Sequence, residues 1–177
     1  IKYVGSNILG SSINMNKVIA KELLKNSNIK IANFIGIKDY ELKNWNFRKI
    51  KKILNVPFFI KPVSTGSSIG INKIYNQKEF QRSLTVALKY DHKIIVEEYI
   101  KGREIECSVL GNTNPIASLP GEIIPKDEFY SYADKCINSD GAQLIIPAKL
   151  NKTQIKKIQA VAIQAYKTLE CSGLARV

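Results

Sequence analysis

The sequence predicts an α+β fold in which antiparallel strands form sheets and helices pack against them. Three observations favour this class. Two apolar runs, Phe58–Lys61 and Ile69–Ile74, flank a short polar loop and have the form of a strand and its returning partner. Apolar residues recur at helical spacing in segments on both sides of these runs. Between Pro57 and Glu106 the expected order is strand, loop, strand, helix, strand, turn, strand.

Three elements are expected before Pro57. Ser11 or Ser12 caps a helix that runs to about Lys25, with apolar residues at helical spacing: Met15, Val18, Ile19, Leu23 and Leu24. Alternation over Ile29–Ile37 predicts a strand. A short helix follows, capped by Asn46, with an apolar stripe at Phe47, Ile50, Ile53 and Leu54.

The loop after Phe58–Lys61 contains only small residues from Ser64 to Ser68. Such a loop can bring backbone N–H groups and hydroxyls against an anion. Lys61 lies where the strand ends, and a lysine there is a common phosphate ligand. The alternative is a plain Gly-Ser hairpin, and a lone Gly-rich loop does not decide between the two.

The segment Asn76–Glu79 has the form of a capping box, and its helix has an apolar stripe at Phe80, Leu84, Ala87 and Leu88. Strands are expected at Lys93–Glu98 and Arg103–Gly111, and Ile116–Leu119 returns as a hairpin. The lone histidine, His92, is interpreted as a solvated turn residue.

The stretch from Pro120 to Gln143 is predicted to be a long irregular loop, and its aromatic residues argue against disorder. Leu144–Ala148 is predicted to be a short strand. Asn151 caps the last helix with Gln154 at the reciprocal position, and the helix has an apolar stripe. A final strand begins at Leu174.

Composition limits the classes of function. The net charge of +12 raises the hypothesis of an RNA-binding protein, but the lysines are scattered and no nucleic-acid motif occurs. No apolar run approaches the length of a bilayer-spanning helix. Cys107, Cys136 and Cys171 are far apart, so neither a zinc site nor a disulfide framework is indicated. Three free thiols suit a reducing cytoplasm.

Three stretches, Phe58–Ile71, Ile94–Glu106 and Pro120–Lys135, together closely resemble the D-alanine–D-alanine ligases of the ATP-grasp superfamily. The resemblance covers almost the whole chain and implies the ATP-grasp fold. It implies a linker helix and the start of the ATP-grasp region at 1–56, a small lid subdomain at 57–111, and an incomplete C-terminal subdomain at 112–177 with an omega loop at 120–143. The family's first domain is expected before Ile1.

The resemblance implies which residues bind ATP. The expected ATP-binding residues are Lys17, Lys61, Ser67, Ser68, Glu97, Glu98, Tyr99, Ile100, Glu104 and Lys135. Lys17 lies in Met15-Asn16-Lys17, where the family has Met-Asp-Lys. The hinge from Glu97 to Ile100 would contact the adenine, and Glu104 the ribose. Without the resemblance, two adjacent glutamates would be interpreted as a solvated strand end.

The resemblance also implies catalytic residues. Arg176 would face the reacting carbonyl, Ser67 or Ser68 would orient the second substrate, and Lys135 would contact the γ-phosphate or the acyl phosphate. Cys136 stands where the family has a tyrosine that bonds to the serine of the glycine loop, so Cys136 and Ser67 bear on substrate selectivity. The metal ligands are expected just after Val177, and none within the chain.

The implied reaction is the two-step ligation of two D-alanines for peptidoglycan synthesis, with ATP and Mg²⁺ or Mn²⁺. The expected protein is a cytoplasmic enzyme, a homodimer at full length, that binds neither nucleic acid nor membrane. The 177-residue chain alone is expected to be inactive. The alternatives are another ATP-grasp carboxylate–amine ligase, a ligase that makes D-alanyl-D-lactate, and a catalytically dead ATP-binding module.

Overall fold

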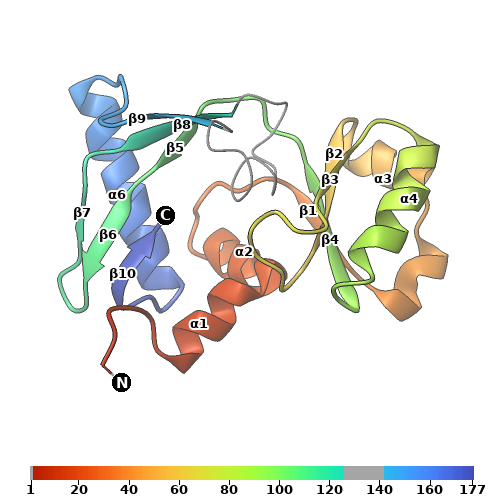
Figure 1. Ribbon diagram of the computed structural model, residues 1–177, viewed down its shortest axis with the longest axis horizontal. Helices are drawn as coiled ribbons and strands as arrows, with labels where there is room; N and C mark the ends of the chain where they lie inside the picture. Colours follow the sequence, from red (N-terminus) through yellow and green to blue (C-terminus); the bar gives the residue numbers. More distant parts are fainter. Residues whose placement is uncertain (1, 126–141) are drawn as a thin grey trace. The chain divides into compact units, whose positions relative to one another are not determined.

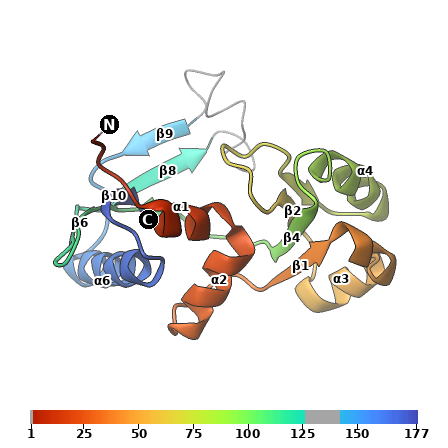
Figure 2. The ribbon, with the colours of Figure 1, turned by 90° about the horizontal axis from the view of Figure 1, so that it is seen from below.

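The computed structural model describes residues 2–125 and 142–177, and the chain forms two compact units (Figures 1 and 2). Each unit has its own hydrophobic core. Unit 1 comprises Ile1–Asn14, Ile19–Lys30 and Gly102–Val177, and unit 2 comprises Met15–Val18 and Ile31–Lys101. Residues Met15–Val18, at the end of α1 (Ile8–Met15) and the start of α2 (Lys17–Asn26), belong to unit 2, and the other residues of both helices belong to unit 1.

Unit 2 is built on a four-stranded antiparallel sheet of order β1-β4-β2-β3. Its strands are β1 (Phe34–Lys38), β2 (Phe58–Pro62), β3 (Asn72–Ile74) and β4 (Lys93–Glu98). Figure 1 shows α3 (Phe47–Leu54) and α4 (Gln77–Ala87) on one face of this sheet. A short 3₁₀ helix, η1 (Asp39–Asn44), follows β1.

The period-two alternation of β2 and β4 separates an apolar face from a second face, called the charged face here, that carries charged side chains among apolar ones. The core under the helices contains Ile37, Ile50, Leu54, Phe58, Ile60, Ile74, Phe80, Ala87, Ile94 and Val96. The intervening residues Phe59, Lys61 and Glu97 therefore lie on the opposite face. In the antiparallel register Phe59 lies opposite Glu97, and Lys61 lies opposite Ile95.

Unit 1 contains two three-stranded antiparallel sheets. One has the order β10-β6-β7, from β6 (Ser108–Gly111), β7 (Ile116–Ala117) and β10 (Gly173–Arg176). The other has the order β5-β8-β9, from β5 (Glu104–Glu106), β8 (Gly121–Pro125) and β9 (Ala142–Ile145). The helix α6 (Lys152–Thr168) packs against the first sheet, with Ala162 and Tyr166 buried beside Cys107 and Val109.

All three predicted asparagine caps are confirmed. The side-chain oxygens of Asn46, Asn76 and Asn151 accept hydrogen bonds from backbone amides three residues later, at 3.0, 3.0 and 2.9 Å. The strand Lys93–Glu98 has its predicted bounds. Caps and a strand buried on both faces are local signals, which explains why the sequence predicts them well.

The prediction of one helix from Ser11 or Ser12 to Lys25 is wrong, because the chain forms two helices with a break at Asn16. The first helix begins earlier, where the Asn7 side chain accepts a hydrogen bond from the amide of Gly10 at 2.9 Å. The break arises where the amide of Lys17 donates to the carbonyl of Val63 at 3.2 Å. This long-range bond has no signal in the local sequence.

Several strand predictions need correction in their bounds. The strand predicted at Leu144–Ala148 is β9, Ala142–Ile145, because its pairing with β8 begins earlier and ends before Pro147. The strand predicted over Ile29–Ile37 is paired only from Phe34, which lies opposite Glu97 near the end of β4. The strand predicted over Arg103–Gly111 is interrupted at Cys107, whose amide and carbonyl both bond to Val177 at 2.8 Å. The return strand predicted from Ile69 is paired only over Asn72–Ile74.

The segment predicted to be irregular from Pro120 to Gln143 is strand at both described ends. β8 pairs with β9, with Glu122 opposite Ile145 and Ile124 opposite Gln143. The flanking Pro and Gly residues suggest a loop locally, and pairing between distant segments overrides them. Residues 126–141, with Lys135 and Cys136, lie outside the described residues.

We expect Tyr166→Phe to lower the free energy of unfolding by about 1–3 kcal/mol, because buried carbonyls lose their donor. Tyr166 is 1% exposed, and its hydroxyl lies 2.5 Å from the carbonyl oxygen of Gly111 and 3.1 Å from that of Gly173. Tyr3→Phe is the matched control, since Tyr3 is 68% exposed and also bonds a carbonyl. Urea unfolding measures both variants, and equal midpoints would contradict the expectation.

Candidate functional site

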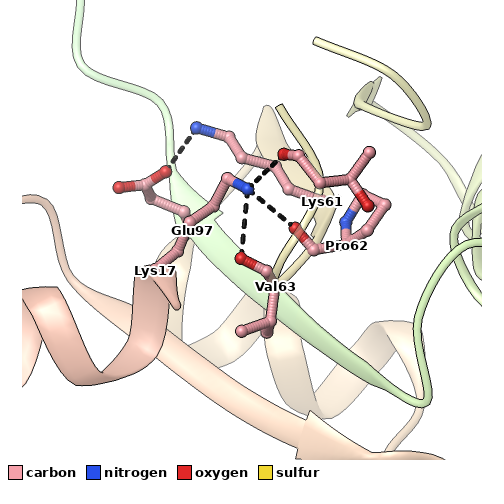
Figure 3. Close-up of polar contacts among 6 residues, drawn as sticks. Lys17, Lys61, Pro62, Val63 and Glu97 are labelled. Atoms are coloured by element: carbon pink, nitrogen blue, oxygen red, sulfur yellow. Dashed lines mark hydrogen bonds and ion pairs between the residues drawn. The ribbon is translucent and has the colours of Figure 1, made fainter. Parts of the chain in front are cut away.

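The charged face of the unit 2 sheet carries an ion pair between β2 and β4. The Nζ atom of Lys61 lies 2.5 Å from Oε2 of Glu97 (Figure 3). The two side chains are 22% and 10% exposed. They are diagonal neighbours on one face because Glu97 pairs with Phe59, two residues before Lys61. The sheet therefore holds a mostly buried cation and anion where β2 ends.

Lys17, at the start of α2, adds a second cation to this face (Figure 3). Its ammonium group donates to the carbonyl oxygens of Pro62, Val63 and Thr65, at 3.1, 3.1 and 2.6 Å. An ammonium has three donors, so these bonds account for all of them. Burial, and next the positive charge of Lys61, lower the pKa of Lys17, while Asp91 and Glu97 act to raise it.

The glycine loop, residues 64–71, joins β2 to β3 in a conformation that is uncommon for its residue types. Ser67 and Ser68 have φ angles of 51° and 58°, and Gly70 has a φ of 72°. Side chains other than glycine seldom occupy this left-handed region, so the surrounding structure must hold the two serines there. Ser67 is exposed and Ser68 is partly exposed.

The hinge after β4 is held by aromatic and polar contacts. The ring of Tyr99 lies 6.1 Å from that of Phe59, and Nζ of Lys73 lies 4.1 Å from the Tyr99 ring centre. The carboxylate of Glu98 accepts from the backbone and side-chain amides of Asn33, at 2.8 and 2.9 Å. Ile100 is 62% exposed and Glu97 only 7%. The alternative of a solvated strand end is therefore wrong for Glu97.

Among the described residues, two expected site residues belong to unit 1. Arg176, on β10, is exposed, and its Nε lies 3.3 Å from Oε2 of Glu106. Glu104, on β5, is also exposed. Within unit 2 the structure brings together Lys17, Lys61, Glu97 and the start of the glycine loop. The expected residues Lys135 and Cys136 lie outside the part of the chain that is described.

The sequence missed Asp91 as a residue of this site. Its carboxylate accepts from the amide of Ser64 at 2.7 Å and from that of Lys93 at 3.0 Å. An aspartate that bonds two residues ahead is a common turn signal, but no local pattern indicates the long-range bond to Ser64. The prediction for His92 is confirmed: its side chain is 96% exposed, with Nδ1 3.1 Å from Asp39.

Within residues 2–125 and 142–177, no group of three His, Cys, Asp or Glu side chains is arranged to hold a metal ion. Across the same residues, no helix combines the length and apolar character needed to cross a bilayer. Cys107 and Cys171 are free thiols in this described part of the chain.

Known proteins resemble this chain in sequence over its whole length. The model of the D-ala D-ala ligase C-terminus matches residues 23–177. The D-alanine–D-alanine ligase of Oceanobacillus iheyensis is 49% identical over 177 residues, and D-alanine–D-alanine ligase A of Escherichia coli K12 is 43% identical. The match covers 100% of this chain, 48% of the first relative and 49% of the second. The chain thus spans about half the length of these curated relatives.

Solved structures resemble it in fold. The D-alanine-D-alanine ligase from Coxiella burnetii matches with a TM-score of 0.83 and 34% identity, covering 99% of this chain and 45% of that one. The VanG D-Ala:D-Ser ligase from Enterococcus faecalis matches with a TM-score of 0.88 and 33% identity, covering 100% of this chain and 51% of that one.

We expect Lys61→Met and Glu97→Gln each to lower the free energy of unfolding by about 1–3 kcal/mol, because each removes one member of a mostly buried ion pair. The double variant should lose at least about 0.5 kcal/mol less than the sum of the two single losses. Denaturant unfolding of all four proteins gives this coupling. Arg176→Met is the control, since the exposed Arg176–Glu106 pair should contribute less than about 1 kcal/mol. Strictly additive losses would contradict the expectation.

Proposed function

The chain belongs to the D-alanine–D-alanine ligase family, and on that premise we propose that the protein joins two D-alanines in an ATP-dependent reaction for peptidoglycan synthesis. Its fold is the ATP-grasp fold of the solved ligases it matches, as the sequence predicted. The observation that carries the proposal is the meeting of Lys17 and Lys61 at the start of the glycine loop. Two cations beside a small-residue loop suit phosphate groups.

The residues of unit 2 fit a nucleotide. Lys61 would balance phosphate charge, and Lys17 lies close enough to Lys61 that each lowers the cost of an anion beside them. Glu97 would accept from the adenine amine, Glu98 would hold the hinge, and Tyr99 with Ile100 would cover the base. Glu104, which belongs to unit 1, would accept from the ribose. ATP, when bound, supplies the phosphoryl group that activates the carboxylate of the first D-alanine.

The remaining residues are assigned to the ligation step. Arg176 would donate to the oxyanion that forms when the second amine attacks, which lowers the energy of that intermediate. Ser67 or Ser68 would orient the second substrate, and Lys135 would contact the transferred phosphoryl group. Charge neutralisation by these lysines is the part of phosphoryl transfer that this chain's own residues supply. We place the protein in the cytoplasm as a homodimer.

A ligase that joins D-alanine to a different second substrate is the second candidate. The likeness to the D-Ala:D-Ser ligase of Enterococcus faecalis, with a TM-score of 0.88, favours it. Cys136 stands at the position expected to bear on this choice, and Ser67 lies in the glycine loop. Both candidates use the same first substrate and the same activation, so the products of the reaction decide between them.

The test is a chimera in which this chain replaces the matching half of the Oceanobacillus iheyensis ligase. With ATP, Mg²⁺ and D-alanine the chimera should release phosphate and form D-alanyl-D-alanine, and Lys61→Ala or Lys135→Ala should each lower turnover about a hundredfold. Parallel reactions with D-serine and D-lactate as second substrates test the alternative. The isolated 177-residue chain is the control. Nucleotide binding without any product would favour a catalytically dead module.

The 177-residue chain on its own should bind the nucleotide ADP. Isothermal titration with ADP should show weak binding, and Lys61→Met should weaken it about tenfold or more because a phosphate partner is lost. Lys52→Met is the matched control, since Lys52 is exposed on α3, which covers the opposite face of the sheet. Equal weakening by both variants would mean that only the net charge attracts the nucleotide. No heat from the folded chain would contradict the assignment of the hinge.

A further inference from the structure

Both ends of the glycine loop, residues 64–71, rest on the turn that joins α4 to β4. We propose that Asp91 is a positioning residue of this loop, and that Tyr90 and Asp91 together form a seat that fixes the loop for nucleotide phosphates. The proposal rests on the proposed function for its ligand. Its geometric part, the fixing of the loop, stands on contacts within unit 2 alone.

The first end of the loop is held through consecutive amides. Oδ2 of Asp91 accepts from the amide of Ser64 at 2.7 Å, and Oδ1 accepts from the amide of Lys93 at 3.0 Å. The carbonyl of Lys93 in turn accepts from the amide of Val63 at 3.0 Å. The Asp91 carboxylate therefore continues the hydrogen bonding between β2 and β4 by one residue, to Ser64 at the start of the glycine loop. Hydrogen bonds to a charged acceptor are roughly twice as strong as neutral ones.

The other end of the loop packs on the residue before Asp91. A Cβ atom at Gly70 would lie 2.9 Å from Cδ2 of Tyr90 and 2.8 Å from Cγ of Pro62. Gly70 also has a φ of 72°, where a side chain is strained. Only glycine lets the loop approach the Tyr90 ring and Pro62 so closely.

Two side chains of opposite charge form hydrogen bonds with the backbone where the glycine loop begins. The ammonium of Lys17 binds the carbonyl oxygens of Pro62, Val63 and Thr65, while the carboxylate of Asp91 binds the amide of Ser64. The two groups therefore bind both carbonyl oxygens and a backbone amide within the same short segment. Each carboxylate oxygen of Asp91 accepts a hydrogen bond from one backbone amide, so the negative charge interacts mainly with the backbone.

This arrangement explains how Ser67 and Ser68 keep left-handed φ angles of 51° and 58°. Residues in that region persist only where the surroundings over-determine them. A loop anchored at both ends has few ways to relax, and preorganised donors bind an anion without a further reorganisation cost. Loss of the Asp91 anchor should therefore weaken binding of phosphates more than binding of the base and sugar.

The test uses the 177-residue chain with Asp91→Asn, which keeps the shape but can accept only one amide, and Gly70→Ala, which leaves Asp91 intact. His92→Ala is the matched control, because His92 lies in the same turn with its side chain 96% exposed. Backbone amide exchange, measured by NMR, reports on Ser64 and the loop. Chemical-shift titrations with ADP and with adenosine report on phosphate and nucleoside binding.

In Asp91→Asn we expect the amide of Ser64 to exchange at least about tenfold faster, and ADP to bind about tenfold more weakly, with adenosine affinity unchanged. Gly70→Ala should weaken ADP similarly while the Ser64 amide stays protected. His92→Ala should change none of these. The amides of Ile94–Val96 in β4 show in every variant whether the sheet remains folded.

Unchanged exchange of the loop amides in a folded Asp91→Asn would overturn the positioning role, whatever the nucleotide does. Faster exchange with unchanged ADP affinity would overturn the link to phosphates, as would equal weakening of ADP and adenosine. If Asp91→Asn unfolds, normal ADP affinity in Gly70→Ala would overturn the proposal that the contact of the loop with Tyr90 fixes it for phosphates. A wild-type chain that binds no ADP contradicts the proposed function, while the exchange rates still decide whether Asp91 fixes the loop.

Discussion

The antiparallel pairing of β2 with β4 is the constraint on which the rest of unit 2 depends. Its register sends Phe58, Ile60, Ile94 and Val96 under α3 and α4. The same alternation places Lys61 and Glu97 together on the other face. A shift of one residue would bury both charges under the helices and move the apolar set to the face that now carries Lys61 and Glu97, so burial of the core fixes the register and with it the site. Core and site are consequences of a single pairing.

Lys17 extends this constraint beyond the sheet. Its three carbonyl partners lie at the end of β2 and the start of the glycine loop, so one side chain joins a helix start to the backbone that leaves the sheet. The partners are neutral dipoles, so the cation stays only partly compensated there, and burial together with Lys61 lowers its pKa. An electropositive position that lacks a full counter-ion is favourable for an incoming anion.

Local signals in the sequence were sufficient for elements that are fixed locally. Asn46, Asn76 and Asn151 cap helices as predicted, and β4 has its predicted bounds. The errors occur where a residue distant in the sequence determines whether a helix continues or a strand forms. The break after α1 depends on the carbonyl of Val63, and β8 depends on its pairing with β9.

The same distinction holds for the site. The sequence indicated Lys61 and the serines of the glycine loop, because a lysine at a strand end and a run of small residues are contiguous patterns. The Lys61–Glu97 pair joins residues 36 positions apart, and the Ser64–Asp91 bond joins residues 27 positions apart. Neither separation carries a pattern in one sequence. The resemblance to a family proposed Glu97 for the site, and only the sheet register shows what Glu97 contacts.

The backbone conformation of the two serines in the glycine loop indicates what the loop binds. A left-handed conformation costs a non-glycine residue roughly 1–2 kcal/mol, and glycine would avoid that cost at either position. Ser67 and Ser68 have φ angles of 51° and 58°, next to a loop end where Gly70 does supply glycine. The hydroxyls therefore have to be useful in a way that offsets the strain. Donation to a bound anion or orientation of a substrate is such a use, and it requires the anchored loop that Lys17 and Asp91 provide.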